Sequence, residues 1–317
     1  MTVGRVDKAP SARAYGTPLG RLPDGLSLWA NRHRKWLFTG PALAFVATLL
    51  AFPIGYTVFL SLTDATGSLR FNLHFVGLQN YLTALTDTDR FWPAVGRTIV
   101  FTVGAVGVEL VLGMAVALLL WRPFRGDRWV RALIMLPLVA PPIAVGLMWL
   151  LIFQPTIGIA NELLAGFGIA PQGWISDPSQ ALPTVMLIDI WQWTPMMTLI
   201  LLAGLTSLPR DLDEAARVDG GNALQRFRYV TLPLLMPTVI AALVLRGIDG
   251  LKTFDILYAT LGSGGGSIHE GETLNVYAYS LNFGYNEYGL AAAVLVLYFI
   301  MIAGAVSLLL VRPRRRG

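Results

Sequence analysis

The stretch EAARVDGGNALQRFRYVTLP occupies residues 214–233 and separates two long apolar runs. It holds acidic and basic side chains and a glycine pair, whereas the flanking runs consist mostly of Leu, Ile, Val, Ala and Met. A polar segment between such runs is typical of a loop that joins two membrane-spanning helices. The fold class therefore depends on how many runs of this kind the 317-residue chain contains.

The composition indicates a membrane protein. Hydrophobic residues make up 55% of the chain and charged residues 14%, against about 25% charged in a typical soluble domain. The mean hydropathy is +0.59. The net charge of +5 comes from basic residues that cluster between apolar runs and at both termini, which suits membrane topology better than a nucleic-acid surface. The absence of Cys excludes disulfides and thiol nucleophiles, and the three His residues are too scattered to indicate a metal site.

Six apolar runs are long enough to cross a bilayer, which takes about 20 residues per helix. We therefore predict an all-α polytopic membrane protein. The expected spans are residues 36–62, 98–121, 132–153, 181–206, 234–261 and 288–311. The fifth is the least apolar because charged residues occupy its second half. Pro137, Pro141 and Pro142 interrupt the third and predict either a hinge or a kink.

Lys and Arg near the span ends predict the orientation of the chain. Basic residues concentrate in the N-terminal tail, after the second and fourth spans, and in the C-terminal RPRRRG, so both termini are expected in the cytoplasm. The remaining segments are cytoplasmic tails at 1–35 and 312–317, a cytoplasmic loop at 207–233, and external loops at 63–97, 154–180 and 262–287. The first run lacks a small-residue cleavage site, so we expect it to remain as a span.

The cytoplasmic loop has the local chemistry of two short helices joined by a turn. Pro209 and the acidic residues after it suit the start of the first helix. Gly220 can end that helix in a left-handed conformation, and Asn222 with Gln225 has the spacing of a capping box for the second. The segment is either an ordinary interfacial loop or a docking element. A phosphate cradle is not supported, because the pattern G-x-x-x-x-G-K-[ST] is absent from the chain, which shows no sign of hydrolysing ATP itself.

The same loop resembles the EAA loop of ABC-importer permeases, in which E-A-A is followed after three residues by G and after nine more by I-x-L-P. Here the motif reads EAA at 214–216, Gly220, and VTLP at 230–233, with Val in place of Ile. Two further stretches, FVGLQNY at 75–81 and FDILYATLGSGGG at 254–266, resemble the maltose-type carbohydrate branch. That branch usually has T-x-G-G-P where this chain has TLGSG at 260–264, so the chain departs from the branch pattern in this external loop.

The resemblance implies a type I ABC importer transmembrane fold whose loop between the fourth and fifth spans docks on a cytoplasmic ATPase subunit. The residues that it implies for ATPase coupling are Glu214, Ala215, Ala216, Asp219, Gly220, Phe227 and Pro233. It also implies a second homologous permease, two ATP-binding cassette subunits and an extracytoplasmic solute-binding protein in a bacterial cytoplasmic membrane. ATP and Mg²⁺ belong to the partner subunits, and this chain is expected to bind no cofactor, metal or nucleic acid.

Polar residues within the spans are expensive and are therefore candidates for the solute pathway. The candidates are Asp189, Gln192, Trp193 and Met196 in the fourth span, and Arg246, Asp249, Gly250, Thr253 and Phe254 in the fifth. They share helix faces, and the resemblance supports a sugar site midway along these helices. Alternatively, Asp189, Arg246 and Asp249 only pair with one another. Glu109 is expected to pack or to form an interhelical hydrogen bond.

These patterns predict a permease subunit of an ATP-driven, binding-protein-dependent importer for a sugar, polyol or sugar derivative. The alternative is an anionic solute, such as a sugar acid, a sulfonated sugar or glycerol phosphate, with Arg246 reading the charge. A membrane-embedded enzyme is disfavoured, because no nucleophile, base and metal ligands converge in the pattern. The glycines at 262–266 predict a flexible external loop rather than an anion nest.

Overall fold

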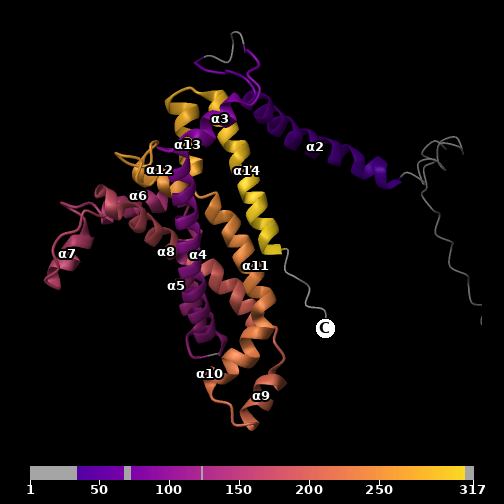
Figure 1. The fold of residues 1–317 in the computed structure, drawn as a ribbon. Coiled ribbons are helices and arrows are strands. Elements are labelled where there is room, and N and C mark those ends of the chain that lie inside the picture. Colours follow the sequence, from indigo (N-terminus) through magenta and orange to yellow (C-terminus); the bar gives the residue numbers. More distant parts are fainter. Residues whose placement is uncertain (1–33, 68–72, 123, 311–317) are drawn as a thin grey trace, which may run out of the picture. The chain divides into compact units, whose positions relative to one another are not determined.

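The computed structural model describes residues 34–67, 73–122 and 124–310 (Figure 1). The regular structure of these residues is helical. The segments between helices include one isolated antiparallel bridge, between Thr63 and Phe75. The all-α class is confirmed for the described part of the chain. The chain divides into two units, Met1–Gly55 and Tyr56–Gly317. Residues 1–33 of the expected N-terminal tail, and the expected tail at 312–317, lie outside the described residues.

The first unit contains most of α2 (Arg34–Ser61), which continues into the second unit. Its stretch Thr39–Ser61 is long and apolar enough to cross a membrane. Pro41 and Pro53 lie within this helix. Prolines inside a spanning helix are tolerated when neighbouring groups satisfy the freed carbonyls.

The second unit is built on three helices, α4 (Phe91–Trp121), α8 (Pro178–Thr206) and α11 (Leu232–Leu251). In Figure 1, α4 runs along α8, and α11 packs against both. Apolar side chains from all three helices bury one another, among them Val106, Met197, Leu201 and Leu235. The last helix, α14 (Tyr288–Leu310), packs against α11, α3 and α13. These helices form the frame that carries the polar residues of the candidate site.

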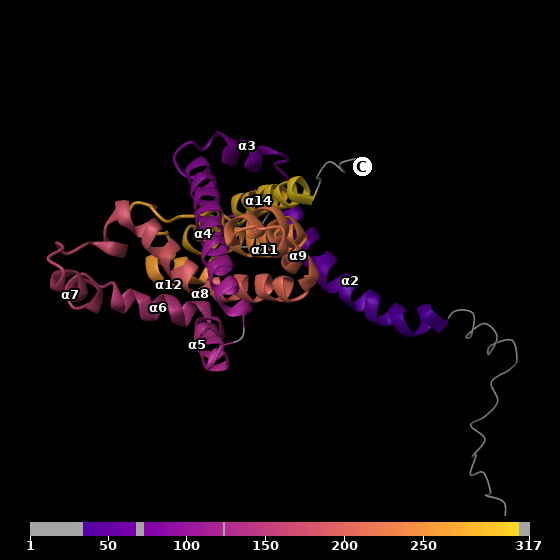
Figure 2. The same cartoon turned by 90° about the horizontal axis from the view of Figure 1, so that it is seen from below.

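The third predicted span is broken rather than straight. It consists of α5 (Asp127–Val139) and α6 (Pro142–Ile152), which meet at an angle of 95°. Ala140 and Pro141 between them adopt extended backbone. Adjacent prolines explain the break, because each lacks an amide hydrogen and disfavours helix in the residue before it. Helix α6 packs on α12 (Asp255–Leu261) and leads toward the short α7 (Ile159–Gly166), which extends away from α4 in both views (Figure 2).

The fifth predicted span is also interrupted. Helix α11 ends at Leu251, and α12 begins at Asp255 after a break over 252–254. The charges that made this run the least apolar flank the break: Asp249 and Lys252 lie at the end of α11, and Asp255 lies in the first turn of α12. A carboxylate is favourable at a helix N-terminus. The charged residues thus mark the interruption of the helix.

The end of the bundle opposite the polar loop contains short helices where external loops were expected: α3 (Gln79–Thr86), α13 (Leu274–Tyr279) and the π-helical η3 (Ser280–Gly284). The side chain of Arg90 makes hydrogen bonds of 2.5 and 3.2 Å to the fully buried carboxylate of Glu272. Asp87 accepts a hydrogen bond of 2.9 Å from the Tyr277 hydroxyl. Burial raises the pKa of Asp87, but the hydrogen bonds from the Arg90 amide and from Tyr277 outweigh it and hold the pKa below its ordinary value.

The glycine-rich loop at 262–266 is shaped by hydrogen bonds within the chain. The Gly266 amide donates to the Leu261 carbonyl at 2.9 Å. The amides of Ser267 and Ile268 donate to the carboxylate of Glu270 at 3.3 and 2.9 Å. These two amides bind a carboxylate of the loop itself, so they do not form an open nest for an external anion.

Candidate functional site

Three charged side chains from three helices meet in the core of the second unit. The Arg246 guanidinium (α11) donates to both carboxylate oxygens of Glu109 (α4), at 2.8 and 2.9 Å, and also to Asp189 (α8). The side chains of this ionic cluster are 0–2% exposed. Removing charges from water is costly unless each one has partners, and the fork of an arginine can serve two carboxylates at once. The cluster therefore ties α4, α8 and α11 together.

The ionic cluster bears on the expectations for its members, while contact of Asp189 and Arg246 with a solute stays a prediction. Asp189 and Arg246 pair, as one alternative held, and Glu109 forms the interhelical contact expected of it. Asp249 is not a member: its carboxylate lies 3.4 Å from the Lys252 ammonium instead. Glu109 was not identified from the sequence as the second carboxylate that binds Arg246. The available signal was its position in an otherwise apolar span, where a buried acid requires a basic partner.

The anionic-solute alternative is not favoured. It required Arg246 to face the pathway with its charge available to a ligand. The guanidinium instead contacts two carboxylates, and its arginine is 1% exposed. Two negative charges beside one positive charge leave no surplus of positive charge to attract an anion.

A cavity of about 360 Å³ opens beside the ionic cluster, where α11 ends and α12 begins. We call it the central cavity. Its walls are formed by Pro142, Asp189, Trp193, Arg246, Asp249, Lys252, Thr253, Phe254, Asp255 and Ile256. Both helix breaks contribute, since Pro142 begins α6 after the bend and residues 252–254 separate α11 from α12. Irregular backbone at this depth is tolerated where it lines a cavity, and broken helices of this kind form the solute sites of many transporters.

Most of the predicted pathway residues line the central cavity, but three do not. Gln192 is 1% exposed and its amide donates to the Ala140 carbonyl at 3.0 Å, which satisfies a backbone group freed by the bend. Met196 lies outside the lining. Gly250 lies behind it, where an added Cβ would come within 3.2 Å of Thr102 and 3.4 Å of the Arg246 guanidinium. Gly250 thus permits the close approach of α11 to α4.

The central cavity combines hydrogen-bonding groups with aromatic faces. Asp249, Lys252 and Thr253 supply hydrogen-bond acceptors and donors to the lining. The Trp193 ring lies 5.1 Å from the Arg246 guanidinium carbon, in cation–π range, which fixes the orientation of the indole. The Phe254 ring also lines the cavity. Such a lining can hold a small polyhydroxylated molecule by hydrogen bonds and by ring stacking. Lys252, Asp255 and Pro142 were not predicted; the charges in the fifth run and the proline pair were the available signals.

The polar loop at 207–233 forms a helical elbow of α9 (Arg210–Val218), α10 (Ala223–Arg226) and the π-helical η2 (Phe227–Thr231). The predicted capping box of Asn222 and Gln225 is confirmed, with both hydrogen bonds at 2.9 Å. Gly220 ends the turn with φ of +84°, as predicted. An ion pair of 3.0 Å between Asp213 and Arg226 holds α9 to α10. The elbow lies at the end of the bundle opposite α13 (Figure 1).

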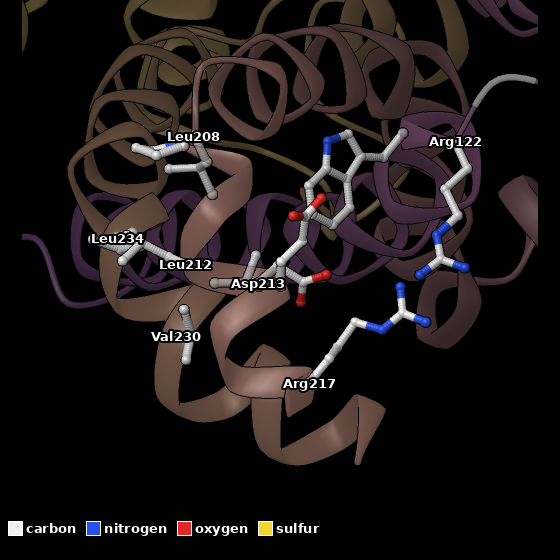
Figure 3. A pocket seen from close by; sticks show the side chains of 11 residues that line it. Arg122, Leu208, Leu212, Asp213, Arg217, Val230 and Leu234 are labelled. Atoms are coloured by element: carbon white, nitrogen blue, oxygen red, sulfur yellow. The ribbon is translucent and has the colours of Figure 1, made fainter. Parts of the chain in front are cut away.

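A cavity of about 330 Å³ lies between α9 and the ends of α4 and α11. Leu208, Leu212, Val230 and Leu234 form its apolar wall, and in Figure 3 the side chains of Arg122 and Arg217 reach toward one another across its opening. Asp213 points into the same space. An apolar hollow rimmed by charges of both signs has the character of a protein-docking surface.

The predicted coupling residues are distributed over the elbow. Glu214 lines the cavity of Figure 3, Ala216 and Asp219 line a smaller hollow beside Tyr229, and Phe227 faces a third with Arg122. Ala215 lies in α9 and is exposed, and Pro233 lies in the first turn of α11. Their role in docking an ATPase stays a prediction.

Residues 109–317 match the family described as binding-protein-dependent transport system inner membrane component. The trehalose/maltose transport system permease protein MalF of Thermococcus litoralis is 36% identical over 84% of this chain and 89% of its own. The trehalose transport system permease protein SugA of Mycobacterium tuberculosis is 33% identical over 87% of each chain. A solved bacterial alginate ABC transporter, in complex with an alginate pentasaccharide-bound periplasmic protein, has a chain with a TM-score of 0.76 and 20% identity, covering 89% of this chain and 95% of that one, which shows the fold. The chain therefore belongs to the inner membrane permease components of binding-protein-dependent ABC importers, as the motif at 214–233 predicted.

Proposed function

We propose that this chain imports an uncharged sugar or polyol through the central cavity, as the permease subunit of an ATP-driven complex. The observation that carries the proposal is the lining of that cavity, in which Trp193 and Phe254 offer rings while Asp249 and Thr253 offer hydrogen-bonding groups. The neutralised Arg246 supports an uncharged solute. The printed names of the relatives, which include transport of trehalose and maltose, support a sugar.

The elbow is the proposed contact with an ATPase subunit. Its small residues Ala215 and Ala216 allow a partner to approach closely, and its hollow offers apolar and charged groups of both signs. The distribution of Lys and Arg supports a cytoplasmic position for this end of the bundle. A second permease, two ATP-binding subunits that use ATP and Mg²⁺, and an external binding protein complete the proposed complex in a bacterial cytoplasmic membrane.

The proposed mechanism is alternating access around the central cavity. The elbow joins α8 directly to α11, so a displacement of a docked ATPase would move both helices. The ionic cluster links those helices to α4, so we expect the three to move as one block. The breaks at 140–141 and 252–254 are the places where the rest of the bundle can move against that block.

Uptake of labelled maltose and trehalose into proteoliposomes that contain the whole complex and its binding protein tests the proposal. Replacing Trp193 by Leu should raise KM or lower the uptake rate about tenfold, since a stacking face and its packing are lost. The matched control is Met196→Leu, one turn away on α8 and outside the cavity lining. Equal effects of both substitutions, or wild-type uptake of neither sugar, would overturn the proposal.

A further inference from the structure

A second cavity, of about 300 Å³, lies between the end of α2 and helices α13, η3 and α14. We call it the aromatic cavity. Phe254 lines both this cavity and the central cavity, so the two share a wall. Its lining also includes Asn275, Tyr279, Asn282 and Phe283. None of them was singled out by the sequence patterns.

Aromatic rings run without interruption from the shared wall to the outer rim of the aromatic cavity. The ring centre of Phe254 lies 5.1 Å from that of Tyr279, which lies 4.7 Å from that of Phe283. Tyr258 packs against the first two, at 5.3 and 5.2 Å. Phe283 is 67% exposed, so its face is available. The π-helical turn η3 carries Asn282 and Phe283, and widened turns of this type are frequent at functional sites.

Amide groups accompany the rings. The Asn275 side chain donates to the Lys252 carbonyl at 3.0 Å, which fixes this amide while leaving its other end free to bind. The Asn282 side chain makes no hydrogen bond to another described residue. Lipid tails and apolar side chains would leave these amides unpaired, at a cost, whereas a hydroxylated ring satisfies them. Small residues at Ala278, Ala291 and Ala292 leave the floor of the cavity open.

We propose that the aromatic cavity binds the second ring of an oligosaccharide whose first ring occupies the central cavity. Phe254 would contact both rings, Tyr279 and Phe283 would stack on the outer one, and Asn275 and Asn282 would hydrogen-bond its hydroxyls. This inference rests on the proposed function of the central cavity. It makes the chain selective for glycosidically linked sugars over single rings.

The test measures binding of glucose, maltose and maltotriose to the detergent-purified whole complex without its binding protein, by saturation-transfer NMR. Wild type should bind maltose about 3- to 10-fold more tightly than glucose, the gain expected from one aromatic contact. Phe283→Leu, which keeps apolar bulk and removes the ring, should abolish that preference, and Asn282→Ala should reduce it. Phe283→Tyr should retain it.

The matched control is Phe167→Leu, an aromatic residue that is 83% exposed and lies outside both cavities. The readout is the ratio of the affinities for two sugars, measured on the same sample of complex. A lower yield of assembled complex therefore does not change this ratio. Equal wild-type affinities for glucose and maltose, or an unchanged preference in Phe283→Leu, would overturn the inference alone. Binding of none of the three sugars would overturn the proposed function as well.

Discussion

At the scale of single residues, the contacts of Arg246 show which polar groups hold the core of the bundle together. The sequence suggested either a ligand contact or a structural pair, and the structure places its guanidinium between Glu109 and Asp189. One cation therefore supports two buried carboxylates. Losing it leaves both without a basic partner among the described residues within hydrogen-bonding distance, whereas losing Glu109 leaves Arg246 with Asp189.

Replacing Arg246 by Gln should therefore reduce folding and transport together. Removal of one member of a buried ion pair costs about 3–5 kcal/mol, which we expect to lower the unfolding temperature and the yield of assembled complex. The double variant Glu109→Gln with Arg246→Gln should recover part of the loss, because one stranded charge is gone. Arg128→Gln is the control, since Arg128 is exposed and lies outside the cavities. A stable Arg246→Gln complex that has lost transport alone would contradict this assignment.

Asp87 should give the end of the bundle opposite the elbow an acid-sensitive component. Its pKa is lowered in the folded chain, so its stabilising contribution is present above the ordinary value of 3.8 and is lost as the pH falls through the folded value. The difference in unfolding temperature between wild type and Asp87→Asn should be largest near about pH 6 and shrink toward about pH 3. The control is the exposed Asp89→Asn. A difference that does not change with pH would contradict the prediction.

At the scale of elements, the elbow depends on backbone conformation more than on space. Gly220 has φ of +84°, yet an added Cβ would meet nothing within 4 Å in this chain. Asn tolerates the left-handed region, while a β-branched residue is strained there by about 1–3 kcal/mol. Branching at the β-carbon of residue 220 should therefore disturb the turn. The size of the side chain should matter only if a partner protein covers this position.

Gly220→Asn should preserve coupling and Gly220→Val should impair it. The ratio of sugar taken up to ATP hydrolysed, measured in proteoliposomes with the complete complex, should stay near the wild-type value in the first variant and fall in the second. Complex recovery on size-exclusion chromatography separates uncoupling from failed assembly. A wild-type ratio of uptake to ATP hydrolysis in Gly220→Val would contradict the proposal that the elbow couples the ATPase to transport.

Local signals in the sequence predicted the elbow well, because its caps and turn depend on neighbouring residues. Asn222, Gln225 and Gly220 behave as their spacing indicated. The central cavity was only partly predictable, because its shape depends on where two helices break and how they then pack. Helical periodicity placed Gln192 on the same face as Trp193, but it could not foresee that the amide would bind the Ala140 carbonyl across the bend.

At the scale of the whole molecule, the second unit has two ends, one formed by the elbow and the other by the short helices around α13. The elbow, which includes Val218 (87% exposed), lies at one end, and Ile268 (66% exposed) lies in the loop that leads from α12 to α13, which lies at the other end. The central cavity lies where α11 ends and α12 begins, and the aromatic cavity lies between the end of α2 and helices α13, η3 and α14. An importer requires the two ends to face opposite sides of the membrane, and the Lys and Arg distribution predicts which end faces which side.

The chain has no Cys, so single substitutions can report this orientation without background. Val218→Cys and Ile268→Cys are suited to labelling with a membrane-impermeant maleimide, because both positions are exposed. In spheroplasts, whose cytoplasmic membrane is intact, Ile268→Cys should be labelled and Val218→Cys should not. Permeabilisation should expose Val218→Cys in the permease expressed alone, and co-expression of the ATPase subunits should protect it again if the elbow is their docking site. Labelling of Val218→Cys from outside would reverse the predicted orientation, and unchanged labelling in the assembled complex would place the ATPase contact elsewhere.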